Sequence, residues 1–174
     1  MSSLTALVIG ATGATGSELV AQLVEDNHFN SVVVFSRRPL NFTHAKLTCH
    51  IVDFDNPQLW AHLVKGDVLF SALATTLKQA GSKTAQYKID YTYQYQTAET
   101  AASNGVQDYV LVSAMGANAN SGFFYPRIKG QLDEAVSKLP FKHIHIFRPG
   151  FLLRQPDKIR PMEKVGIAIT SGHY

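Results

Sequence analysis

A glycine-rich turn that directly follows an apolar run constrains this 174-residue chain more than any other feature. Residues 4–9 (LTALVI) lack polar alternation, as is usual for a strand buried on both faces of a parallel sheet. The turn at 10–16 (GATGATG) comes next and opens an amphipathic helical pattern. Glycines there let backbone N–H groups approach a pyrophosphate at a helix N-terminus. We predict a dinucleotide-binding turn rather than a plain tight turn, with its contacts at Gly10, Thr12, Gly13, Ala14, Thr15 and Gly16.

The rest of the chain alternates short apolar runs with helical patterns. Further strands are expected at 31–36, 47–52, 67–73, 108–113 and 141–147, and helices at 17–25, 58–64, 84–103 and 126–138. This order predicts an α/β fold of the Rossmann type, a doubly wound parallel sheet with helices on both faces. We expect a single domain over residues 1–153, followed by a short C-terminal tail at 154–174. Two interpretations of the tail stay open: a truncated substrate-covering region, or an active site that is unusually open. Ligands should bind at the carboxyl ends of the strands.

Composition narrows the function classes. Hydrophobic residues make up 45% and charged residues 17%, which is typical of a globular domain. The net charge is only +3 and the basic residues are scattered, which argues against nucleic-acid binding. No run approaches the roughly 20 apolar residues of a membrane span. With a single cysteine, Cys49, and no signal peptide, the sequence predicts a soluble cytoplasmic protein.

The segment after the second predicted strand indicates which dinucleotide binds. NAD-specific domains carry an acid there for the ribose 2′-hydroxyl. This chain instead has Ser36, Arg37 and Arg38, and arginine forks match phosphate oxygens. We therefore predict NADP(H), the alternative being two solvated surface arginines. Asp53, after the third strand, either accepts from the adenine amino group or serves as a loop cap, and the two interpretations stay open.

Tyr125 and Lys129 form the candidate catalytic pair. Their i, i+4 spacing places them on one helical face, where an ammonium favours the phenolate and tunes the tyrosine for proton transfer to a carbonyl oxygen. Ser113 ends the fifth strand, and its hydroxyl could hold the same substrate oxygen. Pro126 disfavours helical geometry in the residue before it, which predicts Tyr125 at the helix cap.

The motifs together resemble the atypical short-chain dehydrogenase/reductases and, within them, the TIP30/CC3-like oxidoreductase family and its bacterial relatives. The resemblance rests on GATGATG at 10–16, SRRP at 36–39, VDF at 52–54, DVLFSALATT at 67–76, LVSAMGA at 111–117, YPRIKG at 125–130 and FRPG at 147–150. It implies a Rossmann fold, NADPH binding and the catalytic set Ser113, Tyr125 and Lys129. By the same resemblance Phe54, Leu73, Ala74 and Thr75 line the cofactor, and Lys129 also bonds the nicotinamide ribose.

The function predicted from these features is NADPH-dependent reduction of a carbonyl or similar small substrate. Two alternatives remain: an NADPH-binding regulatory or protein-interaction module without turnover, and an epimerase-like or dehydratase-like enzyme that keeps NADP bound. His143 and His145 alternate on one strand, but with no third ligand at helpful spacing we predict no metal site. Tyr87, Tyr91 and Tyr95 form a helical stripe that is either core packing or the seam of a homodimer.

Overall fold

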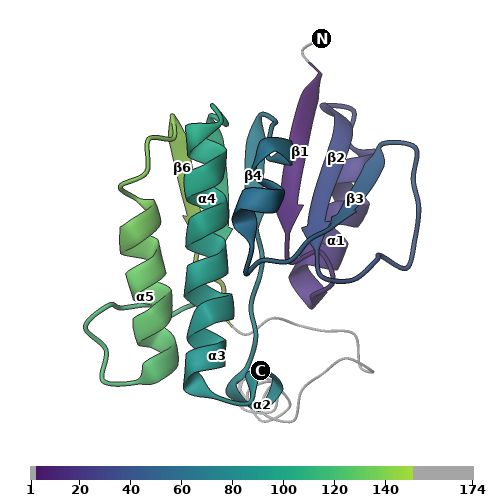
Figure 1. Ribbon diagram of the computed structural model, residues 1–174. Coiled ribbons are helices and arrows are strands. Elements are labelled where there is room, and N and C mark those ends of the chain that lie inside the picture. The colour runs from purple at the N-terminus through teal and green to yellow at the C-terminus, as the bar shows by residue number, and fades with distance from the viewer. Residues whose placement is uncertain (1–2, 151–174) are drawn as a thin grey trace, which may run out of the picture.

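The computed structural model describes residues 3–150, and these form one six-stranded sheet in which every paired strand is parallel (Figure 1). The order across the sheet is β3-β2-β1-β4-β5-β6, which confirms the predicted doubly wound fold. The strands are β1 (Leu4–Ile9), β2 (Phe29–Ser36), β3 (Leu47–Ile51), β4 (Val68–Ser71), β5 (Asp108–Val112) and β6 (His143–Phe147).

Helices occupy the connections between the strands. They are α1 (Ala14–Glu25), α2 (Leu77–Ala80), α3 (Lys83–Tyr87), α4 (Tyr93–Ser103) and α5 (Phe124–Val136), with the 3-10 turns η1 (Pro57–Leu59) and η2 (Ala61–Leu63) and the π turn η3 (Lys88–Thr92).

Two helical predictions differ in detail from the structure. The helix predicted at 58–64 is the pair η1 and η2, because Asn104 Nδ2 donates to the carbonyl oxygens of Ala61 and Val64 at 2.8 Å and so holds the segment from outside. The long helix predicted at 84–103 runs through α3 and α4 but contains the π turn η3 between them.

The surroundings of β1 explain why its sequence is apolar on both faces. Leu7 and Ile9 pack in one core with residues of α4 and α5, whereas Ala6 and Val8 pack in a second core with residues of α1. In Figure 1, α4 and α5 lie in front of the sheet and α1 lies behind it. Both side-chain directions of the strand are therefore buried, as its lack of alternation indicates.

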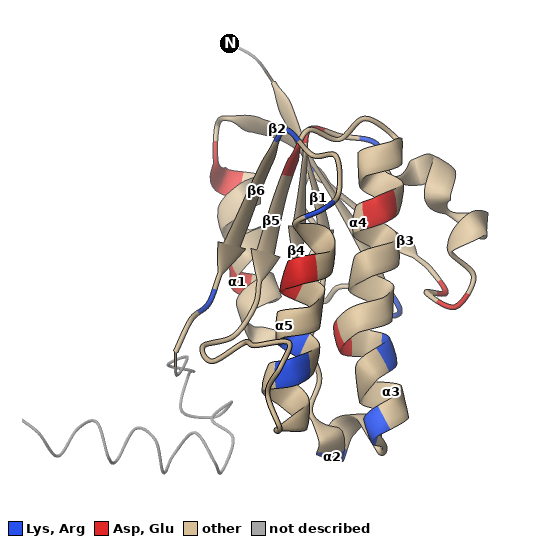
Figure 2. Ribbon diagram, turned by 90° about the vertical axis from the view of Figure 1, so that its left-hand side faces the viewer, with Lys and Arg blue, Asp and Glu red and all other residues tan. Residues whose placement is uncertain are grey.

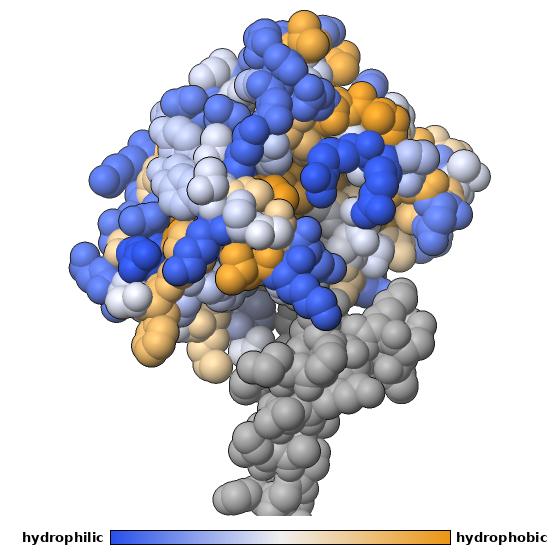
Figure 3. Space-filling view, turned by 60° about the horizontal axis from the view of Figure 1, so that its bottom comes forward, coloured by the Kyte–Doolittle hydropathy of each residue, from blue (hydrophilic) through white to orange (hydrophobic). Residues whose placement is uncertain are grey.

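The chain changes direction across the sheet between β1 and β4. From β1 the connections lead outward to β2 and β3, and from β4 they lead the other way to β5 and β6. Such a switch point opens a crevice at the carboxyl ends of the two central strands. Figure 3 shows this end of the molecule, where hydrophobic side chains lie among hydrophilic ones.

Candidate active site

The glycine turn after β1 is fixed by backbone packing. Gly10 has a φ of +86°, and a Cβ on it would overlap the backbone of Ala72 after β4. A Cβ on Gly16 would overlap the carbonyl of Gly10 itself. Both positions therefore require glycine for steric reasons. The result is that the turn lies tightly against the segment after β4, and the two loops form one wall of the crevice.

Gly13 has a different role in the same turn. It caps α1, whose first turn has no side-chain cap, and a Cβ on it would meet only the Gly10 oxygen, at 3.4 Å. The N-terminus of α1 thus offers backbone N–H groups and the positive end of the helix dipole to an anion. Ala14 and Thr15 in this first turn line the crevice.

One part of the crevice is a cavity of about 730 Å³ beside Arg37 and Arg38. The Ser36 hydroxyl accepts the N–H of Arg38 at 3.3 Å, which shapes the turn that carries both arginines. Lys88 and Tyr93 also line this cavity, and no carboxylate is among the described residues of its lining. The predicted residues that lie here are Gly10, Thr12, Gly13, Arg37, Arg38, Leu73, Ala74 and Thr75.

Asp53 and Phe54 lie outside this lining. The two carboxylate oxygens of Asp53 accept the N–H of Asp55 at 2.9 Å and the amide of Asn56 at 2.7 Å, as a loop cap does. Phe54 is buried in the core, where its ring packs against those of Trp60 and Tyr93. The geometry favours the loop-cap interpretation of Asp53.

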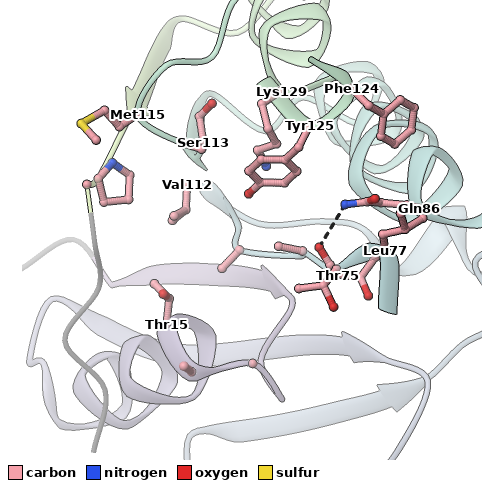
Figure 4. Close-up of a pocket in the computed structure, with 18 of the residues that line it drawn as sticks. Thr15, Thr75, Leu77, Gln86, Val112, Ser113, Met115, Phe124, Tyr125 and Lys129 are labelled. Carbon is pink, nitrogen blue, oxygen red and sulfur yellow. Dashed lines mark hydrogen bonds between the residues drawn. The ribbon is translucent and has the colours of Figure 1, made fainter. Parts of the chain in front are cut away.

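The other part of the crevice is a cavity of about 720 Å³ that brings together Ser113, Tyr125 and Lys129 (Figure 4). Ser113 follows β5, and the other two lie on α5. This cavity shares Gly13, Ala72, Ala74 and Thr75 with the arginine-lined one, so the two form a continuous crevice across the ends of β1 and β4.

Tyr125 belongs to the first turn of α5 and is not its cap. The cap is Phe123, with extended backbone at φ −86° and ψ 136°, and Pro126 is the third residue of the helix. The expectation that proline would hold Tyr125 at the cap is wrong, because proline lacks only an N–H that has no helical partner in the first turn. The Tyr125 ring points into the cavity (Figure 4).

Four buried side-chain polar atoms on β5, at its end and on α5 have no hydrogen-bond partner among the described residues. Within residues 3–150 they are Tyr109 Oη, Ser113 Oγ, Lys129 Nζ and Asp133 Oδ1, on β5, its end and α5. Tyr109 Oη lies near the Ser71 hydroxyl without a hydrogen bond of standard geometry. Such orphaned groups are costly in a folded protein and mark places where water or a ligand binds.

Lys129 is only 1% exposed. Burial lowers the pKa of its ammonium, and the carboxylates of Asp90 and Asp133 act in the opposite direction. Asp133 also accepts from Arg148 Nε at 2.9 Å. Lys129 is among the residues that line the cavity, and its buried Nζ has no hydrogen-bond partner within residues 3–150.

Asp90, which the sequence analysis missed, lies in the π turn η3 and is 0% exposed. Burial raises the pKa of its carboxyl to about 6, against the opposing effects of Lys129 and of hydrogen bonds from Thr75 and Gln86. A signal was present in the sequence: Gln86, Asp90 and Gln94 follow each other at i, i+4 spacing, one position before the tyrosine stripe. All three are buried.

The tyrosine stripe itself is partly exposed. Tyr91 stacks on Tyr87 with ring centres 4.9 Å apart and on Tyr95 at 6.0 Å, and Tyr91 and Tyr95 also pack against the core. His143 pairs with Asp108 at 2.6 Å, and no cluster of three metal-ligating side chains occurs among the described residues. In the same range, no helix is long and apolar enough to cross a membrane.

Comparison with known proteins decides the family. A family model described as NAD(P)H-binding matches residues 10–157. The chain belongs to this NAD(P)H-binding family. Protein HTATIP2 of Rattus norvegicus is 32% identical over 94% of the chain, and the assignment to the atypical, TIP30-like short-chain dehydrogenase/reductases is confirmed.

Fungal relatives of the family are closer in sequence. The mitochondrial protein FMP52 of Candida albicans is 36% identical over 98% of this chain and 76% of its own length, and that of Saccharomyces cerevisiae is 40% identical over 86% and 66%. The chain thus spans about two thirds to three quarters of these relatives. These relatives are named as mitochondrial proteins, which contradicts the predicted cytoplasmic location. Targeting signals are recognised by cellular receptors, so amino-acid composition is a poor predictor of the compartment in which a protein is found.

Solved structures of the same fold include the Bordetella bronchiseptica enzyme WbmG in complex with NAD and UDP. It has a TM-score of 0.76 at 13% identity, covering 98% of this chain and 61% of that one. MoeE5 in complex with UDP-glucose and NAD has a TM-score of 0.69 at 18% identity, covering 83% and 53%. At this identity the likeness establishes the Rossmann fold.

Proposed function

We propose that this protein is an NADP(H)-dependent oxidoreductase that reduces the carbonyl group of a small, largely apolar substrate. The observation that carries the proposal is the cavity that Ser113, Tyr125 and Lys129 line together, in which Ser113 Oγ and Lys129 Nζ are buried with no hydrogen-bond partner among residues 3–150. A hydroxyl, a phenol and an ammonium in one crevice are suited to hold a carbonyl oxygen and move a proton to it.

The residues present fit a nicotinamide dinucleotide. Gly10 and Gly16 allow a tight turn in which a Cβ at either position would overlap the backbone. The N-terminus of α1, which has no side-chain cap, follows this turn and lies at the crevice. Arg37 and Arg38 lie in the part of the crevice whose described lining has no carboxylate, which favours a 2′-phosphate over a free 2′-hydroxyl. Lys129 Nζ would bond the nicotinamide ribose. When bound, the nicotinamide supplies the hydride.

The chain's own residues would handle the proton and the oxygen. The Lys129 ammonium lowers the cost of negative charge on the Tyr125 oxygen, so that Tyr125 can give its proton to the substrate oxygen at neutral pH. The Ser113 hydroxyl donates to the same oxygen and holds it within reach of Tyr125. Thr75, after β4, borders both parts of the crevice and would fix the cofactor between them.

The rim of the catalytic cavity supports an apolar substrate. Leu77 and Met115 line it with 47% and 64% of their surface exposed, and Phe124 and Pro149 line it as well. Exposed apolar side chains at a cavity mouth are typical of sites that bind apolar ligands. Apart from Lys129, the one charged side chain among the described lining residues is Lys83, whose ammonium lies 5.6 Å from the centre of the Phe124 ring.

Turnover with a panel of aliphatic and aromatic aldehydes and ketones tests the enzyme proposal, with NADPH oxidation followed at saturating cofactor. Tyr125→Phe should lower turnover by about 100-fold or more and leave NADPH affinity nearly unchanged. Tyr95→Phe, the same chemical change on α4 at a residue that lines neither part of the crevice, is the matched control and should keep its activity. NADPH binding without consumption of any carbonyl would favour the NADPH-binding module without turnover instead.

Cofactor choice is tested by titrating NADPH and NADH in the same protein. NADPH should bind at least about 10-fold more tightly, and Arg37→Ala or Arg38→Ala should remove most of the difference, because each arginine contributes charge-assisted hydrogen bonds to the phosphate. Arg127, whose Nη1 donates to the carbonyls of Ser121 and Gly122 away from this cavity, provides the control Arg127→Ala. Equal affinities in the unchanged protein would contradict the arginine argument.

A further inference from the structure

Lys83 is a charged side chain of the catalytic part of the crevice that the proposed reaction does not use. It lines that part together with Tyr125 and Lys129, and it does not line the part beside the arginines. No carboxylate is among the described residues that line either part. An anion that enters the catalytic part therefore meets two lysines and, in the described lining, no negative charge.

The Lys83 ammonium is held by an aromatic ring and not by an acid. It lies 5.6 Å from the centre of the Phe124 ring, within the range of a cation–π interaction. Lys83 is exposed, yet none of the ion pairs within residues 3–150 includes it. Lys88, further along the same helix, gives the contrast, because it pairs with Asp55 at 2.6 Å. The described residues therefore leave the charge of Lys83 without a carboxylate partner.

The charge of Lys83 gives α3 itself no benefit. Lys83 is the first residue of α3, where the helix dipole disfavours a cation. The Ser82 side chain caps the helix by accepting the N–H of Ala85 at 3.1 Å, so the start of the helix does not depend on Lys83. In Figure 2 the basic bands of α3 and α5 lie at the end of the molecule near α2, and the acidic bands of α4 and α5 lie farther from it. Binding of an anion in the crevice accounts for this charge better than helix stability does.

The contact with Phe124 relates the charge to the reacting groups. Phe124 precedes Tyr125 on α5, and both residues line the catalytic cavity. Figure 4 shows Phe124 and Leu77 on one side of Tyr125 and Met115 on the other. A molecule that extends from Tyr125 past the Phe124 ring to Lys83 therefore needs an oxygen at one end, an apolar middle and a negative charge at the other end.

We propose that the substrate is an oxo acid, whose carboxylate binds the Lys83 ammonium while its carbonyl oxygen lies between Ser113 and Tyr125. A single lysine among apolar side chains matches the single charge of a carboxylate, whereas a phosphate ester carries roughly two charges and favours arginine forks. The inference rests on the proposed reductase function and names its substrate class. The carboxylate is unchanged in the reaction, in which the carbonyl gains a hydride from NADPH and a proton to give the hydroxy acid and NADP⁺.

Substrate pairs that differ in charge test the proposal in the unchanged protein. Levulinate, its longer straight-chain homologues and formylbenzoate are each compared with the corresponding uncharged primary amide, and NADPH oxidation is followed. In the best-fitting pair the acid should exceed the amide by about 10-fold or more in kcat/KM, because a charge-assisted hydrogen bond to Lys83 is available only to the acid. The difference should lie mainly in KM, since Lys83 does not contact the carbonyl. Equal values in every pair would overturn the proposal.

Substitutions of Lys83 test whether this residue causes the preference. Lys83→Gln should remove the preference for the acids, and Lys83→Glu should turn it in favour of the amides. Lys78→Gln is the matched control, because Lys78 is exposed on α2 and lines neither part of the crevice, and it should keep the preference. NADPH should bind Lys83→Gln as tightly as it binds the unchanged protein. A loss of NADPH affinity would assign Lys83 to the cofactor and overturn the proposal.

Calorimetry on the protein saturated with NADP⁺ needs no turnover, because the oxidised cofactor cannot reduce an oxo acid. The acids should bind this complex more tightly than their amides, and Lys83→Gln should abolish the difference. Acids that bind through Lys83 to a protein that reduces no carbonyl would support the anion site and count against the reductase function. Reduction of carbonyls with no preference for acids, or no binding of acids at all, would overturn the inference about Lys83.

Discussion

The two parts of the crevice differ in what forms them: backbone in one part and buried polar side chains in the other. The part beside the glycine turn depends on backbone: Gly10 and Gly16 fit because they have no side chain, and the helix N-terminus needs no particular residue to attract an anion. The part beside α5 depends on side chains that are buried without partners, among them Ser113 Oγ and Lys129 Nζ. The glycine turn of the first part is already closely packed without a ligand. The second contains buried polar groups that the described residues leave without partners, which lowers the stability of the folded protein.

This contrast predicts that the largest effect on folding comes from the glycine turn. Gly10→Ala would place a Cβ in the Ala72 backbone and force a non-glycine residue to a φ of +86°. We expect it to lower the free energy of unfolding by roughly 3 kcal/mol or more, from overpacking and left-handed strain together. Urea denaturation measures this loss. Gly81→Ala is the control, since Gly81 has the same φ but nothing near its Cβ position, and it should cost clearly less.

The second-largest expected effect is on the free energy of unfolding, and it depends on pH through Asp90. Because burial raises the pKa of Asp90 to about 6 from its ordinary 3.8, the folded protein binds the proton more tightly than the unfolded chain. Stability from this group is present below pH 4 and is lost as the pH rises through 6. The loss is at most about 3 kcal/mol, at 1.36 kcal/mol for each pH unit. Asp90→Asn should remove this slope, measured by urea denaturation between pH 4 and 7. A slope equal to that of the unchanged protein would contradict the assignment.

A third prediction separates binding from folding within the glycine turn. Gly13→Val should leave the protein folded, since a Cβ there meets only the Gly10 oxygen at 3.4 Å, yet the larger side chain stands where a pyrophosphate would approach. NADPH affinity should fall about 10-fold or more, as a blocked anion site at a helix N-terminus would require. Calorimetry measures the affinity and circular dichroism the fold. Normal NADPH binding by Gly13→Val would place the ligand elsewhere.

The smallest effect on stability should come from Ser113. Its hydroxyl is buried without a hydrogen-bond partner among residues 3–150, so Ser113→Ala removes a group that contributes nothing to folding. We expect the free energy of unfolding to change by less than about 1 kcal/mol, or to rise, while turnover falls. Thr97→Val is the contrasting variant, because the Thr97 hydroxyl donates to the Tyr93 oxygen at 2.7 Å. A strongly destabilised Ser113→Ala would mean that the hydroxyl has a structural partner.

The amino-acid sequence by itself determined the parts of this protein that depend on local rules. Apolar runs predicted all six strands, and GATGATG between a strand and a helix predicted the turn at the switch point, because glycine spacing and helix polarity act within a few residues. The positions of Ser113, Tyr125 and Lys129 at one strand end and on one helical face follow from the same local periodicities. Their assembly in a single cavity needed only the order of strands in a parallel sheet.

Only the tertiary structure decided which face of the long helix is buried. Hydrophobicity favoured the stripe of Tyr87, Tyr91 and Tyr95 as the buried face. Those side chains are partly exposed, and the polar stripe beside them, which includes Asp90, is buried. The reason is that Lys129, the Thr75 backbone and Ser71 approach from other elements and satisfy or attract those polar groups. A buried carboxylate is acceptable only where such partners meet it, and partners that lie 15 to 39 positions away in the sequence are brought together by the fold alone.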